Sequence, residues 1–255
     1  MKHLLFTALI GLVVAGCQPT PEPIDPSNTT YVVTVGMENS AWAGSCPGAG
    51  IDCTRMTELF KAYTPNIRTF QSEKANKKDI VAAMKNAAAN AELFIFYYSG
   101  HGGSEITKIP APEEVDGKDE FLCLNDTHML DDEIWEIISK AKGRVVLMFD
   151  CCHSETMFRC PVFNMKHCIP LAATHSAEGA LKMCCMSGCP DDTYSYGSSS
   201  GGMFTNAFLK YYKKNQSASY DEIWALVEGD ATLKEAEEVQ RTLMGGFDTS
   251  KPIFK

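Results

Sequence analysis

Five short runs of β-branched and aromatic residues, separated by stretches with helical periodicity, constrain the fold of this chain more than any other feature. We predict strands over residues 31–35, 67–70, 93–98, 145–149 and 183–186 and helices over residues 52–63, 78–91 and 131–142. Ser219 and Glu222 form a capping box that predicts a further helix start. The alternation is typical of an α/β/α sandwich, in which helices flank a mainly parallel central sheet.

The composition is that of an ordinary globular protein: 45% of the 255 residues are hydrophobic and 22% are charged. We see no internal repeat. The formal charge of −9 offers no basic stripe to neutralise phosphates, so the sequence predicts no nucleic-acid partner. The same acidic balance favours basic substrates.

The amino-terminal segment has the features of a targeting sequence. Lys2 and His3 precede an apolar run over residues 4–14, which is too short to cross a bilayer. The end of this run, Val-Ala-Gly-Cys17, resembles a bacterial lipobox, whose cysteine becomes lipidated; the alternative is an ordinary secretory signal. We predict a lipoprotein signal peptide over residues 1–16, a proline-rich tether over 17–29 and one domain over 30–255. A lipid on Cys17 would anchor the protein to a membrane of the bacterial cell envelope, facing outside the cytoplasm.

Disulfides can persist outside the cytoplasm, which bears on how the eleven cysteines are interpreted. If Cys17 carries lipid and one thiol is catalytic, the nine others cannot all pair. Two local pairings are candidates, Cys46 with Cys53 and Cys160 with Cys168. The sequence does not fix this connectivity.

Reactive side chains follow two of the predicted strands. Residues 93–98 run into Ser-Gly-His101-Gly-Gly, and residues 145–149 run into Asp150, Cys151, Cys152 and His153. Functional groups gather at the carboxyl ends of parallel strands, so a thiol and an imidazole should meet there. A nearby imidazole can lower the pKa of a thiol and later protonate a leaving amine. His153 is an alternative base, but adjacent side chains on extended backbone point apart, and we rank it below His101.

The segments YYSGHGG and DCCHS resemble those of metacaspase-type members of the caspase-like cysteine peptidases. Cys152 follows His101 by 51 residues, close to the roughly 50 of caspases. Residues 120–126 are similar to a further family segment, although Leu124 replaces a proline, and residues 187–192 and 201–205 match a family turn and helix start. The similarity covers residues 30–255 and implies a caspase-like fold.

The resemblance also implies roles for individual residues. His101 is expected to be the catalytic histidine and Cys152 the nucleophile of a cysteine endopeptidase, and the backbone N–H groups of Gly102 and Cys152 are expected to bind the oxyanion. Asp52 and Asp150 match acidic residues of the primary specificity pocket, so cleavage is expected after Arg or Lys. Asp52 has an equally supported interpretation as the N-cap of its own helix.

The resemblance further implies calcium as an activator, although the peptidase reaction itself does not require a metal ion. Asp126, Asp131 and Asp132 match positions that bind calcium in several metacaspases, and oxygen ligands suit this ion. Acidic residues at 131–133 could equally mark a helix start. A fourth acidic ligand is not evident, because Arg159 stands near its place.

Two other functions compete with the peptidase. One is a thiol-based metal or redox module, for which the candidate residues are Cys151, Cys152, His153, Cys184, Cys185 and Cys189; their spacing does not match the usual zinc pattern. The other is a catalytically silent binding protein with the same fold. The partners expected are a peptide or protein substrate with basic residues and the membrane, and we expect a monomer. The long segment 159–181 is either a processing loop or a surface insertion.

Overall fold

A six-stranded sheet forms the centre of the computed structural model, which describes residues 27–106, 118–155, 157–158, 181–191 and 193–255. The strand order is β13-β10-β9-β5-β1-β4. The strands are β1 (Thr30–Gly36), β4 (Ile67–Gln71), β5 (Leu93–Ser99), β9 (Arg144–Asp150), β10 (Met183–Ser187) and β13 (Gln240–Met244). All pairs are parallel except β10 with β13. The five predicted strands are therefore confirmed, while the antiparallel edge strand β13 was not predicted.

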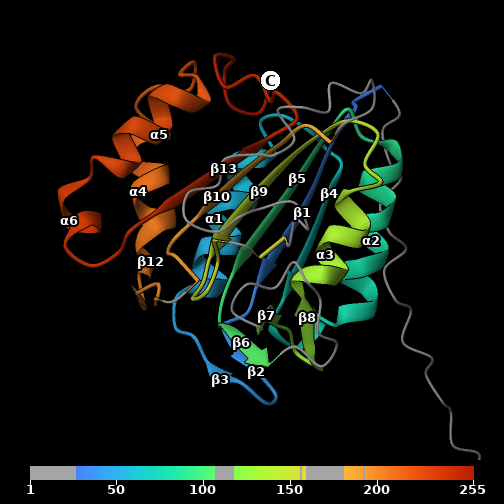
Figure 1. Ribbon diagram of the computed structural model, residues 1–255, viewed down its shortest axis with the longest axis vertical. Coiled ribbons are helices and arrows are strands. Elements are labelled where there is room, and N and C mark those ends of the chain that lie inside the picture. The colour runs from blue at the N-terminus through green and yellow to red at the C-terminus, as the bar shows by residue number, and fades with distance from the viewer. Residues whose placement is uncertain (1–26, 107–117, 156, 159–180, 192) are drawn as a thin grey trace, which may run out of the picture.

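Helices cover both faces of this sheet (Figure 1). One face packs against α2 (Lys77–Asn90) and α3 (Asp131–Ile138). The other packs against α1 (Ala49–Phe60), α4 (Met203–Tyr212) and α5 (Tyr220–Glu228), with the short α6 (Ala231–Lys234) beyond them. The α/β/α class is confirmed, and the capping box of Ser219 and Glu222 begins α5 as predicted.

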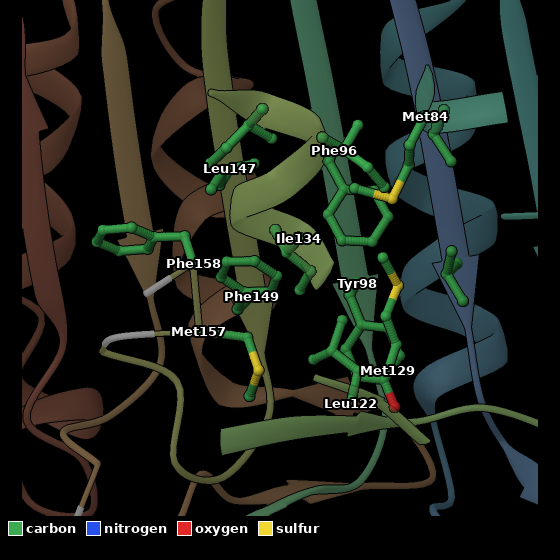
Figure 2. Packing of buried hydrophobic residues seen from close by; sticks show 14 of the residues in the cluster. Met84, Phe96, Tyr98, Leu122, Met129, Ile134, Leu147, Phe149, Met157 and Phe158 are labelled. Carbon is green, nitrogen blue, oxygen red and sulfur yellow. The ribbon is translucent and has the colours of Figure 1, made fainter. Parts of the chain in front are cut away.

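Alternate residues of each central strand enter different cores, as the period of two in a strand requires. Phe94, Phe96 and Tyr98 of β5 face α2 and α3, while Leu93, Ile95 and Tyr97 face α1 and α4. Figure 2 shows the first of these cores, where the rings of Phe96 and Phe149 meet edge to face with their centroids 5.9 Å apart. Burial on both faces explains why these strands are continuous apolar runs.

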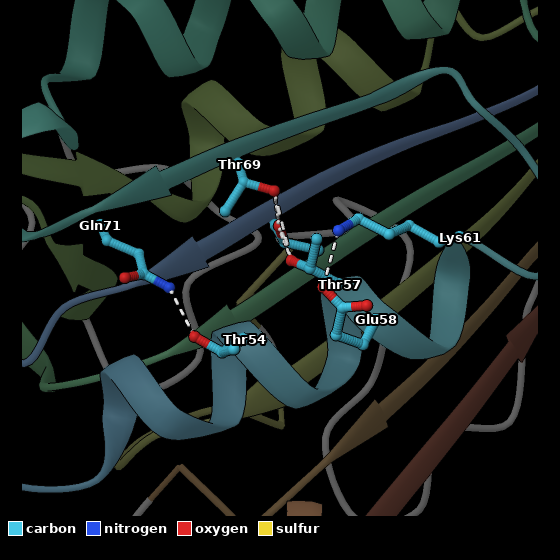
Figure 3. Close-up of polar contacts among 7 residues, drawn as sticks. Thr54, Thr57, Glu58, Lys61, Thr69 and Gln71 are labelled. Carbon is cyan, nitrogen blue, oxygen red and sulfur yellow. Dashed lines mark hydrogen bonds and ion pairs between the residues drawn. The ribbon is translucent and has the colours of Figure 1, made fainter.

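Threonine hydroxyl groups hydrogen-bond α1 to strands β1 and β4. Thr34, Thr57 and Thr69 lie within hydrogen-bond distance of one another, at 2.8, 2.9 and 3.2 Å between their Oγ1 atoms. Nearer the start of α1, the Gln71 amide donates to the Thr54 hydroxyl at 3.1 Å (Figure 3). These contacts fix the helix that carries Asp52.

Small antiparallel elements gather at the carboxyl ends of the central strands. A second sheet consists of β6 (Gly102–Ile106), β7 (Lys118–Cys123) and β8 (His128–Leu130). Two hairpins lie nearby, β2 (Asn39–Ser40) with β3 (Gly44–Ser45) and β11 (Gly197–Ser198) with β12 (Gly201–Gly202). A single 3₁₀ turn, η1 (Ser72–Lys74), follows β4. None of the helices in the described residues is both long and apolar enough to cross a membrane.

Candidate active site

His101 and Cys152 occupy equivalent places after two neighbouring parallel strands. Ser99, at the end of β5, pairs with Asp150, at the end of β9, and the Gly100 N–H donates to the Asp150 carbonyl at 3.3 Å. Each of the two candidate residues follows its strand end by two positions. The two chain segments remain in contact beyond the sheet. They approach so closely that a Cβ added to Gly102 would lie only 2.2 Å from the Cys152 carbonyl oxygen. The glycine after His101 is therefore required by the close approach of the cysteine segment.

The half-buried His101 is held at its ring and at its backbone. Its Nε2 lies 3.0 Å from the Ser45 carbonyl oxygen, and the Tyr98 hydroxyl donates to the His101 carbonyl at 2.7 Å. A carbonyl oxygen can only accept, so Nε2 carries the proton in the neutral ring and Nδ1 keeps its lone pair. This tautomer leaves one ring nitrogen able to accept a proton.

The two adjacent thiols differ sharply in environment. Cys152 is half-buried, its Sγ lies 3.7 Å from the Ser195 carbonyl oxygen, and burial raises its pKa. Its own backbone N–H opposes that rise. Cys151 is 2% exposed within the core beneath α2 and α3, and burial raises its pKa well above the ordinary value. Only Cys152 is therefore placed to react, and it needs a base to form a thiolate.

His153 is turned toward a different segment. Its backbone adopts the left-handed region with φ of 52°, its Nδ1 contacts the Asp191 carbonyl, and its ring meets Tyr194 edge to face at 5.7 Å. These contacts engage the ring with Asp191 and Tyr194. The geometry agrees with ranking His153 below His101 as a base.

Two buried carboxylates lie beneath the start of α4. Asp52, fully buried, accepts from the Gly202 N–H at 2.7 Å and the Ser99 hydroxyl at 3.0 Å. Asp150, 5% exposed, accepts from the Thr205 N–H at 2.8 Å and the Ser195 hydroxyl at 3.0 Å. The structure thus brings together the two acidic residues that the sequence analysis paired.

The N-cap interpretation of Asp52 is wrong. The cap of α1 is Gly48, with a left-handed φ of 98°, and Asp52 lies on the buried side of the first turn. A Cβ on Gly48 would lie 2.1 Å from the Ser198 carbonyl oxygen, so α1 starts directly against the β11–β12 hairpin. That contact places the Asp52 carboxylate against Gly201 and within hydrogen-bond distance of the Gly202 N–H.

Asp52 and Asp150 place two carboxyl groups close together in a buried environment without enough positive charge to offset them. Burial, followed by the nearby Asp150, raises the pKa of Asp52 to about 7, and burial also raises the pKa of Asp150. Arg55 lowers the pKa of Asp52 less than the other neighbouring groups do, and its guanidinium donates to the Ser200 carbonyl at 2.8 Å and to Asn206 at 3.0 Å. The Oδ1 atom of Asp52 has no hydrogen-bond partner among the described residues. Such a site is suited to receiving a positive charge.

A third carboxylate, Glu237, joins this group and was not predicted. It is 7% exposed, and its Oε1 lies 3.0 Å from the Ser195 Oγ and accepts from the Tyr196 N–H. Burial and then Asp150 raise its pKa to about 8. Ser195 therefore links Asp150 to Glu237. Glu237 lies in the polar run KEAEEV, where no motif or spacing distinguishes it from its neighbours.

The three residues proposed for calcium serve helix starts. The Asp126 carboxylate accepts from the Lys77 N–H at 2.9 Å, where α2 begins, and Asp131 and Asp132 open α3. Asp131 is 1% exposed and accepts from the N–H of Asp132 at 2.9 Å. The described part of the chain contains no cluster of three or more His, Cys, Asp or Glu side chains able to hold a metal ion. The three carboxylates thus do not fit a common site, and calcium activation remains a prediction.

The candidate pairing of Cys46 with Cys53 is not formed, because both are free thiols. Cys53 packs from α1 against Gly36 of β1, with its Sγ 3.9 Å from the Phe70 carbonyl oxygen. Cys46 precedes the helix, where burial and then Asp150 raise its pKa to about 11. Cys160 and Cys168 lie outside the described residues, as do Cys17, the signal peptide and most of the tether and of segment 159–181.

The cysteines considered for a metal or redox module are divided between the two faces of the sheet. Cys184 belongs to the core beneath α1, α4 and α5, while Cys185 and Cys151 belong to the core beneath α2 and α3. This separation disfavours a shared metal site.

Comparison with known proteins agrees with this fold. The family model described as "Caspase domain" matches residues 30–244. A crystal structure of the protein GSU0716 from Geobacter sulfurreducens superimposes with a TM-score of 0.68 at 20% sequence identity, covering 89% of this chain and 98% of that one. Caspase-1 from Spodoptera frugiperda superimposes with a TM-score of 0.61 at 12% identity, covering 87% of this chain and 90% of that one. No protein with a curated description matches the sequence. The chain belongs to the caspase domain family.

Proposed function

We propose that the chain is a cysteine endopeptidase that cleaves after Arg or Lys with Cys152 as nucleophile and His101 as base. The observation that carries the proposal is the equivalent placement of the two residues at adjacent strand ends, with Gly102 against the Cys152 carbonyl. Caspase-family membership supports cysteine peptidase chemistry. The difference between the two thiols supports Cys152 in preference to Cys151.

The proposed reaction has two stages. The Cys152 thiol gives its proton to Nδ1 of His101, and the sulfur attacks the carbonyl carbon of the scissile bond. The negative charge on the carbonyl oxygen is stabilised by backbone N–H groups, for which Cys152 and Gly102 are the candidates. His101 then protonates the departing amine, leaving an acyl group on the sulfur. In the second stage His101 takes a proton from water and the resulting hydroxide attacks the acyl carbon. The bond between carbon and sulfur then breaks, the carboxylic acid product leaves, and His101 returns its proton to the sulfur.

Basic specificity follows from the buried carboxylates. Asp52 and Asp150 lack a strong positive partner, and an ammonium or guanidinium group would supply one through charge-assisted hydrogen bonds. Gly201 and Gly202 lie directly on these carboxylates, so a Cβ at either would be 2.2 Å from a carboxylate oxygen. Entry of a basic side chain therefore requires the β11–β12 hairpin to move and the Gly202 N–H to leave Asp52.

The cellular setting belongs to the same proposal. A lipidated Cys17 and a proline-rich tether would hold a monomeric domain at the membrane of the cell envelope, where it would meet protein substrates with exposed basic residues. Globomycin treatment, which blocks lipoprotein signal cleavage, should lead to retention of the signal peptide; unchanged processing would contradict the lipoprotein assignment.

Paired fluorogenic peptides test the activity. Peptides ending in Arg, Lys, Asp or Gln before the reporter are compared with the wild type, Cys152→Ala and Cys151→Ala. We expect hydrolysis after Arg and Lys by the wild type and Cys151→Ala, and none by Cys152→Ala. Faster cleavage after Asp would overturn the specificity. Absence of all activity in the folded protein would favour a silent binding protein.

A further inference from the structure

The Glu237 carboxyl group contacts Ser195 at its side chain and at its backbone. Its Oε1 lies 3.0 Å from the Ser195 Oγ and accepts from the N–H of the next residue, Tyr196. The same Ser195 hydroxyl lies 3.0 Å from Oδ1 of Asp150. Ser195 therefore stands between two buried carboxyl groups, of which the proposed reaction uses only Asp150.

A single peptide group lies between Glu237 and the candidate nucleophile. The Ser195 carbonyl and the Tyr196 N–H belong to one planar amide, in which they point in opposite directions. Glu237 holds the N–H, and the carbonyl oxygen lies 3.7 Å from the Cys152 Sγ. The orientation of the carbonyl that meets the thiol thus depends on the Glu237 side chain.

The Ser195 hydroxyl has one proton for two carboxyl neighbours. A hydroxyl donates one hydrogen bond and accepts others through its lone pairs. If Asp150 and Glu237 were both ionised, one of them would face the hydroxyl oxygen at 3.0 Å with no proton between the two atoms. If one carboxyl group carries a proton, it donates to Ser195 and Ser195 donates to the other. Both contacts are then hydrogen bonds.

The surroundings favour Glu237 as the group that carries this proton. Burial raises the pKa of Asp150, but hydrogen bonds from the side chain and the backbone of Thr205 oppose that rise. The Oε2 of Glu237 has no donor among the described residues, and burial, followed by Asp150, raises the pKa of Glu237 to about 8. A carboxyl group with few donors and a negative neighbour is the one that stays protonated.

The charges around Glu237 do not reverse this preference. The ionisable groups near it are Asp150 at the end of β9, Cys152 beyond it, Tyr194 and Tyr196 in the segment 193–196, and Lys234, Glu235 and Glu238 on its own segment. Lys234, Glu235 and Glu238 are exposed, so solvent and salt screen them. Asp150 supplies the charge that shifts the pKa of Glu237, and that charge is negative.

We propose that Glu237 is a positioning residue that acts in its protonated form. It donates to the Ser195 hydroxyl and accepts from the Tyr196 N–H, and it thereby fixes the amide whose carbonyl meets the Cys152 thiol. This role rests on the proposed peptidase function and adds a proton-dependent control of the same site.

Loss of the proton should slow the reaction. Two ionised carboxylates would share one hydroxyl proton and repel each other, so the amide would no longer be held and the thiol would be less well aligned. Because the pKa of Glu237 is about 8, its contribution to kcat should be present at about pH 6.5 and lost at about pH 9.5. KM should stay within about twofold, because a misaligned nucleophile slows the chemical step without removing substrate contacts.

Glu237→Gln and Ser195→Ala test this role with a fluorogenic arginyl peptide between about pH 6.5 and pH 9.5. Dividing the kcat of the wild type by that of each variant cancels the titrations they share. The ratio should be about tenfold at low pH for each variant, the effect of one lost hydrogen bond, and should fall toward one through about pH 8. The control is Glu238→Gln, an exposed neighbour, whose ratio should stay near one at every pH.

The double variant Ser195→Ala/Glu237→Gln separates positioning from a direct effect of charge on the thiol. In the Ser195→Ala background, Glu237→Gln should lower kcat at about pH 6.5 by less than about twofold, because the hydrogen bond between the two residues is already absent. A full tenfold loss there would overturn the link through Ser195. Ser195→Ala is a small change at a half-buried residue, so it tests the role even if Glu237→Gln fails to fold.

Infrared spectroscopy provides a readout that does not depend on activity. At about pH 6.5 the wild type should show the carbonyl stretching band of a protonated carboxyl group that Glu237→Gln lacks, and no such difference would overturn the protonated form. A kcat ratio that is constant across the pH range would overturn the positioning role and leave the peptidase function standing. No cleavage of any peptide by the folded wild type would overturn both.

Discussion

Replacing Glu237 by Gln should change the stability of the protein in opposite directions at low and high pH. Burial and Asp150 raise the pKa of this carboxyl group from 4.5 to about 8. A group whose folded pKa is raised stabilises the fold fully below its unfolded pKa and loses that contribution as the pH rises through the folded pKa. The folded protein should therefore lose stability between about pH 4.5 and pH 8 on account of Glu237 alone.

The rise from 4.5 to about 8 sets the magnitude. At roughly 1.4 kcal/mol per pKa unit, the lost contribution approaches ~5 kcal/mol above pH 8. Gln does not titrate, and its Oε1 can still accept from Ser195 and Tyr196. Its amide nitrogen would take the position of the unpaired Oε2 and leave buried donors unsatisfied, at a cost of about 1 to 3 kcal/mol. The variant should thus be ~1 to 3 kcal/mol less stable than the wild type at pH 4.5 and ~2 to 4 kcal/mol more stable at pH 9.

Urea unfolding followed by circular dichroism at the two pH values measures both differences. Both proteins carry Cys152→Ala to prevent self-cleavage. Glu58→Gln is the control, because this exposed side chain pairs with Lys61 at the surface and should shift stability by less than about 1 kcal/mol at either pH. A difference of the same sign and size at pH 4.5 and pH 9 would refute the view that burial keeps Glu237 protonated.

Three further predictions concern the site. Gly102→Ala should lower kcat/KM by about 100-fold while the protein stays folded, because the added Cβ must displace the Cys152 carbonyl; near-normal activity would show that the contact is not needed for alignment. Since the pKa of Asp52 is about 7, the preference for Arg over Gln at the cleavage position should rise between pH 6 and pH 8, and Asp52→Asn should abolish that rise. Measuring the ratio of the two rates cancels the titration of the thiol. Asp126→Ala should destabilise the protein by about 1 kcal/mol through loss of the cap on α2, seen as a lower urea midpoint. If Asp126 also binds activating calcium, the calcium dependence of kcat/KM should shift in this variant; identical titrations would exclude that role.

Local pattern was enough to predict the centre of the fold. The strands β5 and β9 are buried on both faces, so they read as uninterrupted apolar runs, and the groups that follow them lie at one edge of the sheet. The segment of β13, QRTLM, was missed because an edge strand can carry polar residues and its pairing with β10 is set by distant contacts.

The remaining features were not predicted because they depend on residues that are distant in sequence and meet only in the folded chain. Ser195 and Glu237 lie 42 positions apart, and only the packing of α6 and residues 193–196 brings them together. The candidate pairing of Cys46 with Cys53 is not formed for a related reason: the separation of two cysteines in sequence does not tell which way each side chain faces, and Cys53 faces β1. The sequence thus indicated the candidate reacting groups, whereas the acidic surroundings of Cys152 became evident only in the structure.

Labelling with a peptidyl-arginine acyloxymethyl ketone tests the central claim most directly. The wild type, Cys151→Ala and Cys152→Ala are treated with equal amounts of reagent, and adducts are located by mass spectrometry of peptides. We predict one adduct on Cys152 in the wild type and in Cys151→Ala, and none in Cys152→Ala. An adduct on another cysteine in the wild type, or undiminished labelling of Cys152→Ala, would contradict the assignment of Cys152 as the nucleophile.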